Sequence, residues 1–253
     1  MSGLRSLLQI SEGGAGAVNF DQFYVYNTNK TAHNNGGCCC LWTIPTGVKW
    51  FAVELWGGGG SGAGSCCCMQ GWPGGSGSYA RKFVTGLSGT GGEQYTLCAA
   101  GSTVCSQQKC SGCSGNPSFV SVSGGAVQVC ASGGGQGFTR CQFSQGCAYT
   151  GCPNMQCGSW TGTMGICGQT GAAKGSSFCA VSSWGVMPSA PFTNGGNRIT
   201  RHYCFHEQGC YAGGFAHWPG GGGASAVSHS TRAGCGSPGA GGLITIYYPV
   251  VTE

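Results

Sequence analysis

Cysteine is the most abundant reactive side chain in this sequence, with 20 cysteines among 253 residues. So many thiols in one chain are expected to be paired as disulfides or bound to metal. The even count favours pairing, which predicts an oxidising environment such as a particle surface or the extracellular space. Every cysteine is therefore a disulfide candidate: Cys38, Cys39, Cys40, Cys66, Cys67, Cys68, Cys98, Cys105, Cys110, Cys113, Cys130, Cys141, Cys147, Cys152, Cys157, Cys167, Cys179, Cys204, Cys210 and Cys235.

Two cysteine triplets, 38–40 and 66–68, have a spacing that suits β-strands. Alternate residues of a strand point to the same face, so two paired strands can bring several cysteines into register. A thiolate metal cluster is the alternative, but no ligand spacing typical of zinc accompanies the triplets. The C-x-x-C formed by Cys110 and Cys113 lacks the βαβ context of a redox site, so we expect it to be structural as well.

Two histidines form the pattern closest to a metal site. His202 and His206 are four residues apart, so a helix would place them on one face. The segment lies between glycine-rich stretches, shows no helical pattern and lacks the H-E-x-x-H order. We keep both histidines as weak metal-ligand candidates and predict that the protein has no cofactor.

No catalytic motif is visible. The chain has only six acidic residues, and no two of them are spaced for acid–base hydrolysis. It contains neither a G-x-S-x-G elbow nor a phosphate-binding P-loop. We predict that the protein is not an enzyme.

Charge and hydropathy bear on partners and location. The 11 basic residues are scattered without a run, which argues against nucleic-acid binding. No apolar run approaches the ~20 residues of a membrane helix. Residues 1–10 lack the long apolar region and cleavage site of a secretion signal. Oxidising conditions without an export signal fit a virus particle released by lysis.

Two of the seven tryptophans are candidates for contact with a partner. Trp72 and Trp218 are each followed by Pro-Gly, which predicts loops. An exposed indole in a loop can stack on a sugar, although tryptophan in a glycine-rich protein more often packs in a core or an interface. We predict that these two contact a protein partner or a host glycan.

The elements that must position these groups are β-strands. In segment 48–56, Lys49, Phe51, Val53 and Leu55 alternate with the other residues and are predicted to face the core. Glycine accounts for 53 residues, so the core is thin, and disulfides worth ~2–4 kcal/mol each are expected to compensate. The strands are predicted at 41–44, 48–56, 79–84, 94–99 and 243–248.

These features predict an all-β protein: a glycine-rich antiparallel β-sandwich stapled by disulfides, with a long Cys/Gly-rich loop insert. Residues 1–35 are predicted to be an arm that docks onto a neighbour or the domain edge. Residues 36–102 and 221–253 form the sandwich. Residues 103–220 form the insert, in which only 119–122 and 126–130 have short strand signals.

Three segments resemble a known family. WTIPTGVKWFAVELWGGGGSGAG at 42–64, then GGSGSYARKFV, and GLITIYY near the end are similar to the glycine-rich domain of bacteriophage virion proteins. That family occurs in tail fibres and other appendages. The resemblance covers 42–102 and 221–249, and it implies a structural or adhesin role with no catalytic residues. The cysteine content departs from the usual family pattern.

The expected function is therefore that of a phage virion structural protein. It would be an oligomeric, fibre-type tail or capsid appendage subunit on the particle surface, with itself and other virion proteins as partners. One alternative is an adhesin that recognises a host cell-surface glycan. A metal-binding protein is the other alternative.

Overall fold

The computed structural model describes residues 20–25, 37–64, 70–104, 110–140, 146–147, 163–168, 172–174, 183–187, 190–193, 198–202, 216–225 and 235–249. Within these ranges every regular element is a β-strand, and the fold is an all-β sandwich, as predicted. The described part contains no helix long and apolar enough to span a membrane.

The first sheet of the sandwich has the strand order β1-β15-β3-β5-β11, and all its pairs are antiparallel. Two of its strands, β3 and β15, match the strongest strand patterns in the sequence. The arm segment pairs with β15 as β1, so it docks on the edge of its own sheet. The bounds are β1 (Phe20–Val25), β15 (Leu243–Pro249), β3 (Trp50–Trp56), β5 (Tyr79–Thr85) and β11 (Met164–Ile166).

The second sheet has the order β2-β6-β7-β8 and is also antiparallel. Its strands are β2 (Cys38–Thr43), β6 (Gln94–Ala99), β7 (Ser118–Val122) and β8 (Val127–Ala131). Strands β7 and β8 lie inside the range predicted to be an insert. These two short strands extend the second sheet from β6.

Two smaller sheets lie away from the sandwich. One has the order β10-β12-β13-β14 and the other pairs β4 with β9. Their strands are β4 (Gln70–Gly71), β9 (Thr139–Arg140), β10 (Gly146–Cys147), β12 (Ala172–Lys174), β13 (Ser183–Met187) and β14 (Arg198–His202).

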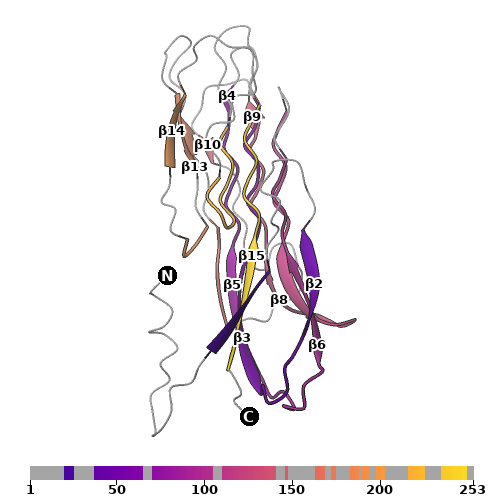
Figure 1. Cartoon of the computed structure of the whole chain (residues 1–253). Coiled ribbons are helices and arrows are strands. Elements are labelled where there is room, and N and C mark those ends of the chain that lie inside the picture. The colour runs from indigo at the N-terminus through magenta and orange to yellow at the C-terminus, as the bar shows by residue number, and fades with distance from the viewer. Residues whose placement is uncertain are drawn as a thin grey trace, which may run out of the picture.

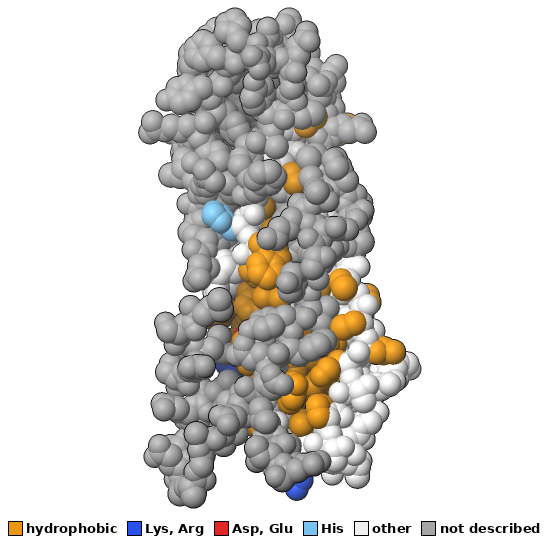
Figure 2. All heavy atoms as spheres, viewed as in Figure 1, with side chains coloured by type: hydrophobic (Ala, Val, Ile, Leu, Met, Phe, Trp, Pro, Cys, Tyr) orange, Lys and Arg blue, Asp and Glu red, His pale blue; other side chains and the backbone are white. Residues whose placement is uncertain are grey.

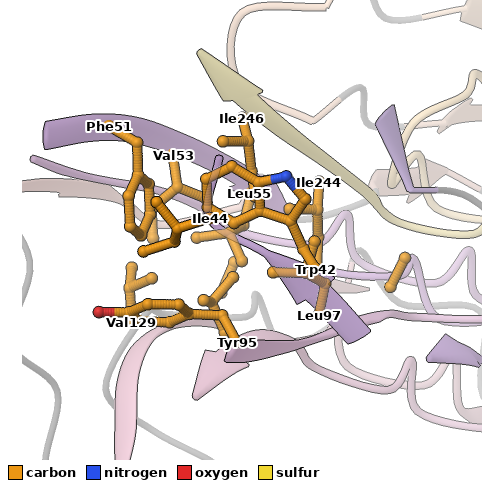
Figure 3. Close-up of a cluster of buried hydrophobic side chains, with 14 of the residues drawn as sticks. Trp42, Ile44, Phe51, Val53, Leu55, Tyr95, Leu97, Val129, Ile244 and Ile246 are labelled. Carbon is orange, nitrogen blue, oxygen red and sulfur yellow. The ribbon is translucent and has the colours of Figure 1, made fainter. Parts of the chain in front are cut away.

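The hydrophobic core lies between the two large sheets (Figure 3). Phe51, Val53 and Leu55 are fully buried there, which confirms the predicted core face of β3. The Trp42 and Phe51 rings meet edge to face at 5.0 Å, a favoured aromatic geometry. Residues on the opposite face of β3, such as Ala52 and Glu54, are also buried, so this strand is covered on both sides.

Beyond the sandwich, the glycine-rich stretches form a second ordered region, which we call the glycine bundle. It comprises segments 57–64, 72–78, 100–104, 110–116, 132–138, 220–225 and 235–242. Six of the seven continue directly from sandwich strands: β3, β5, β6, β7, β8 and β15. Figure 1 shows the sandwich strands at the lower end and the extended segments rising from them.

The hydrogen bonds of the central segment 57–64 repeat every third residue. Successive N–H groups donate to three different neighbours, with N···O distances between 2.8 and 3.0 Å. Segment 110–116 accepts from the N–H groups of Gly58, Ser61 and Gly64. Segment 235–242 accepts from Gly59 and Gly62, and segment 72–78 accepts from Gly60 and Ala63. Three residues per turn with every hydrogen bond directed outward is the polyproline II helix. Packed glycine chains of this kind are known as polyglycine II.

Segment 57–64 lies at the centre of the bundle. In order around it, its neighbours are 72–78, 132–138, 110–116, 100–104, 235–242 and 220–225. Segment 57–64 follows β3 of the sandwich in the chain. Further along the chain, residues 70–71 form β4, which pairs with β9. A backbone surrounded in this way has no hydrocarbon to bury, so hydrogen bonds between segments replace a hydrophobic core.

Glycine is required in the bundle by lack of space. A Cβ atom on Gly60 or Gly62 would lie far inside 3.0 Å of the backbone carbonyl oxygen of Gly135 or Ala224. Among the described bundle glycines only Gly220 has a positive φ, 72°. The close approach of backbones, rather than an unusual φ, therefore explains the glycines.

Candidate functional site

The described surface has one strained and exposed aromatic residue, in a tight turn at 190–193. The Ala190 carbonyl accepts hydrogen bonds from the Thr193 N–H at 3.4 Å and from the Thr193 hydroxyl at 2.8 Å. Pro191 occupies the second position, and Phe192 the third with φ of 57°. Proline followed by a positive φ is the signature of a type II turn, in which the third position normally holds glycine.

Phe192 is therefore costly in two ways. The left-handed conformation costs an L-residue roughly 1–2 kcal/mol. Its ring is also 65% exposed, so burial repays little of that cost. The turn therefore holds a largely exposed apolar ring on a strained backbone.

The wall behind this turn is built by the ends of β3 and β5. The Trp56 indole Nε1–H donates to the Pro191 carbonyl at 2.7 Å and anchors the turn. The Tyr79 ring lies 5.1 Å from the Trp56 ring and 4.8 Å from the Phe192 ring, the latter in an edge-to-face arrangement. We call Trp56, Tyr79 and Phe192 the aromatic corner.

A buried carboxylate supports the aromatic corner from below. Glu54 is 2% exposed, and its Oε1 accepts the Tyr79 hydroxyl at 2.7 Å while its Oε2 accepts the Tyr247 hydroxyl at 3.2 Å. The Arg81 Nε lies 3.8 Å from Oε1, and the Arg81 guanidinium also lies over the Phe83 ring at 4.8 Å. Burial, and then the negative charge of Glu54, raise the pKa of Tyr79 far above its usual value. Tyr79 is therefore held neutral as a hydrogen-bond donor to Glu54.

The two predicted tryptophan contacts have different positions. Trp218 is 50% exposed, close in the chain to Gly220, where an added Cβ would lie 3.1 Å from the Ala190 Cβ. Trp72 is 6% exposed in the glycine bundle, so its ring is not presented at the surface, contrary to the prediction. Trp-Pro-Gly is typical of turns and so predicts a loop, whereas Trp72 here begins the extended segment 72–78.

Figure 2 shows described hydrophobic side chains forming a band along one face, between the grey regions. A histidine side chain lies beside the upper part of this band. Described apolar and polar side chains therefore lie next to each other on this face.

The cysteines are only partly described. Cys39 on β2 and Cys98 on β6 form a disulfide across directly opposed strand positions, and Cys130 is disulfide-bonded as well. Cys38 and Cys40 lie on the other face of β2 as half-buried thiols against the core. Burial, and then the neighbouring Cys38, raise the pKa of Cys40.

Cys110 and Cys113 are exposed thiols in the bundle, so the structure does not pair them as the sequence predicted. Cys167 is exposed and Cys235 is buried. The remaining candidates lie outside the described residues or have no described side chain: Cys66, Cys67, Cys68, Cys105, Cys141, Cys147, Cys152, Cys157, Cys179, Cys204 and Cys210.

The described residues include no group of three or more His, Cys, Asp or Glu side chains placed to hold a metal ion. His202 is the last residue of β14, and His206 lies outside the described residues. The predicted pairing of His202 with His206 therefore stays a prediction.

Sequence reasoning missed the aromatic corner and its support. The Ala-Pro-Phe-Thr stretch contains one usable signal, since proline predicts the second position of a turn. Nothing in it predicts phenylalanine at a positive φ. The hydrogen bonds to Glu54 leave no local signal, because Tyr79 on β5 and Tyr247 on β15 are 25 and 193 residues away in the chain.

Glu54, the buried carboxylate that supports the aromatic corner, accepts hydrogen bonds from Tyr79 and Tyr247. No protein-family model matches the chain, and no curated protein matches it.

Proposed function

We propose that this chain is a phage virion structural protein, an oligomeric tail or capsid appendage subunit on the particle surface. The observation that carries the proposal is the glycine bundle that continues from the sandwich strands. Seven extended segments joined by backbone hydrogen bonds form a projection from the sandwich. At ~3.1 Å per residue, an eight-residue segment extends about 25 Å from the sandwich.

The composition supports the same proposal. Only 7% of the residues are charged, so the surface is poorly suited to a freely diffusing protein and well suited to contact with neighbouring subunits. The similarity of 42–64 and the closing strand to the glycine-rich virion domain adds to this. As such a subunit, the chain would bind copies of itself and other virion proteins and would have no enzymatic activity.

Labelling of particles tests the proposal. Antibodies against the recombinant chain, used for immunogold electron microscopy, are expected to mark purified virions at regular, repeated positions. Mass spectrometry of the same particles should find many copies of the chain per virion. Antigen that remains in the soluble lysate while purified particles are unlabelled would refute the proposal.

A host-receptor adhesin is the second candidate, and Phe192 is the observation that favours it. The strained turn displays an aromatic ring, and half-exposed Trp218 is two residues from Gly220, which lies against Ala190 of the turn. Exposed aromatic rings of this kind are suited to stack on a glycan. Binding of the fluorescent protein to host cells tests this. The Phe192→Ala variant should lose binding, whereas Leu41→Ala, which removes another exposed apolar side chain (59% exposed), should not. Equal binding by both variants would exclude the aromatic corner as the receptor site.

A further inference from the structure

Cys110 and Cys113 are the two exposed thiols of segment 110–116, on the rim of the glycine bundle. Their carbonyl groups accept hydrogen bonds from the Gly64 and Ser61 N–H groups at 3.0 and 2.9 Å. The Cys113 N–H also donates to the Ser61 hydroxyl at 2.7 Å. With its backbone bonded to the central segment, each cysteine directs its side chain outward.

Burial along the segment follows the same three-residue repeat. Gly112 and Gly115 are buried and donate to the carbonyls of Gly137 and Gly134 at 2.8 Å each. The residues between them are exposed, so every third position faces the bundle. Cys110 and Cys113 are three residues apart and therefore lie on the same outer face.

This geometry prevents the two thiols from bonding to each other. One turn of a polyproline II helix rises about 9 Å over three residues. A disulfide needs Cα atoms within roughly 4.4–6.8 Å. Closing the C-x-x-C would require the segment to leave the bundle and lose its hydrogen bonds to 57–64 and 132–138.

We propose that two copies of this chain are joined along this rim by two disulfides, each between Cys110 of one copy and Cys113 of the other. In a two-fold dimer whose 110–116 segments run antiparallel, Cys110 of the first copy faces Cys113 of the second. Cys113 of the first copy then faces Cys110 of the second, about 9 Å further along the segment. Both bridges can therefore form without strain, because the two spacings are the same. A closed two-fold contact of this kind is the commonest arrangement in homo-oligomers.

The side chains around the thiols permit the required approach. The other exposed positions of the segment are Ser111, Ser114 and Asn116, and none of them is large. Two backbones can therefore come within disulfide distance, as the bundle segments already do within one copy. To form both disulfides, a different protein would need two thiols about 9 Å apart. A second copy of this chain has that spacing, because its own Cys110 and Cys113 are also three residues apart.

Each bridge forms by thiol–disulfide exchange with a small-molecule disulfide, which is the oxidant. The Cys110 thiolate attacks one sulfur of that disulfide and releases a first small thiol. The Cys113 thiolate of the second copy then attacks the Cys110 sulfur of the mixed disulfide and releases a second small thiol. The two protein protons end on the two released thiols, and the two electrons reduce the small-molecule disulfide.

The inference rests on the self-association part of the proposed function and is tested separately from location in a virion. The full-length protein is incubated with oxidised glutathione and analysed by non-reducing electrophoresis and intact mass. A dimer that reductant dissociates is expected. Peptide mapping of a mixture of ¹⁴N- and ¹⁵N-labelled protein should show isotopically mixed Cys110–Cys113 cross-links.

Two double variants complete the test. Cys110→Ser with Cys113→Ser should reduce the covalent dimer at least tenfold. Cys38→Ser with Cys40→Ser, which removes two half-buried thiols, should leave it unchanged. A Cys110–Cys113 bridge within one chain, or an undiminished dimer in the first variant, would overturn the inference. If virions are labelled by antibody while both thiols remain alkylatable in them, the proposed function stands and the cross-link does not.

Discussion

A single methyl group added at the centre of the glycine bundle is expected to destabilise the protein strongly. Gly60 donates to the Gly75 carbonyl at 2.9 Å and accepts from the Gly223 N–H at 2.8 Å. In Gly60→Ala, the new Cβ would lie well inside 3.0 Å of the Gly135 carbonyl oxygen. That oxygen also accepts from the Gly75 N–H at 2.9 Å, so one methyl group disturbs three segments around 57–64.

The size of the effect follows from these contacts. Overpacking costs about 1–3 kcal/mol, and weakening two hydrogen bonds adds about 0.5–1.5 kcal/mol each. Alanine restricts the unfolded chain and returns about 0.4–1 kcal/mol. The net loss is about 3 kcal/mol, which corresponds to a fall in Tm of roughly 6–12 °C at 2–4 °C per kcal/mol.

Gly58→Ala is the matched control, because Gly58 lies in the same segment. Its added Cβ would be 3.1 Å from both the Ala100 Cβ and the Gly101 carbonyl oxygen, a contact relieved by a shift of a few tenths of an ångström. Its stability should stay within about 1 kcal/mol of the unmodified chain. Scanning calorimetry under oxidising conditions compares the two. Equal Tm values for Gly60→Ala and Gly58→Ala would refute the view that backbone contact requires glycine here.

Three further predictions concern the sandwich and the aromatic corner. Replacing Cys39 and Cys98 together by serine should lower stability by about 2–4 kcal/mol, since their disulfide closes a loop across 59 residues, whereas Cys38→Ser should cost less; urea unfolding measures both. Because the folded-state pKa of Tyr79 is raised, its contribution to stability is complete below the unfolded pKa of about 10 and declines above it. Unfolding measured between pH 9 and 11 should therefore show a steeper decline for the unmodified chain than for Tyr79→Phe, and parallel curves would contradict the assignment. At Phe192, the glycine variant should be more stable than the alanine variant by about 1 kcal/mol, because only alanine keeps the cost of the positive φ; the reverse order would argue against a strained turn.

The sandwich was predictable because strand burial leaves a two-residue pattern in the sequence. Alternation in 48–56 identified Phe51, Val53 and Leu55 as core residues, and all three are fully buried. The pattern of 94–99 predicted β6 with its bounds. Strands β7 and β8 were detected but assigned to the insert, since nothing local shows that they pair with β6.

The glycine bundle was not predictable by the same reasoning. Glycine runs usually mark flexible connections, so the sequence of 57–64 by itself predicts a loop rather than an ordered segment. Its order comes from hydrogen bonds to segments such as 110–116 and 235–242, which are distant in the chain. The three-residue repeat of the hydrogen bonds leaves no matching pattern of residue types in 57–64, where only Ser61 and Ala63 carry side chains.

The central segment with its six backbone neighbours has a thermodynamic consequence. Melting this region would hydrate amide groups far more than hydrocarbon, and amide hydration lowers the heat capacity of the unfolded state whereas hydrocarbon hydration raises it. The heat-capacity increment per residue should therefore fall below the ordinary ~12–15 cal/mol/K. A smaller increment flattens the curve of stability against temperature, so this protein would keep similar stability in cold and in warm water.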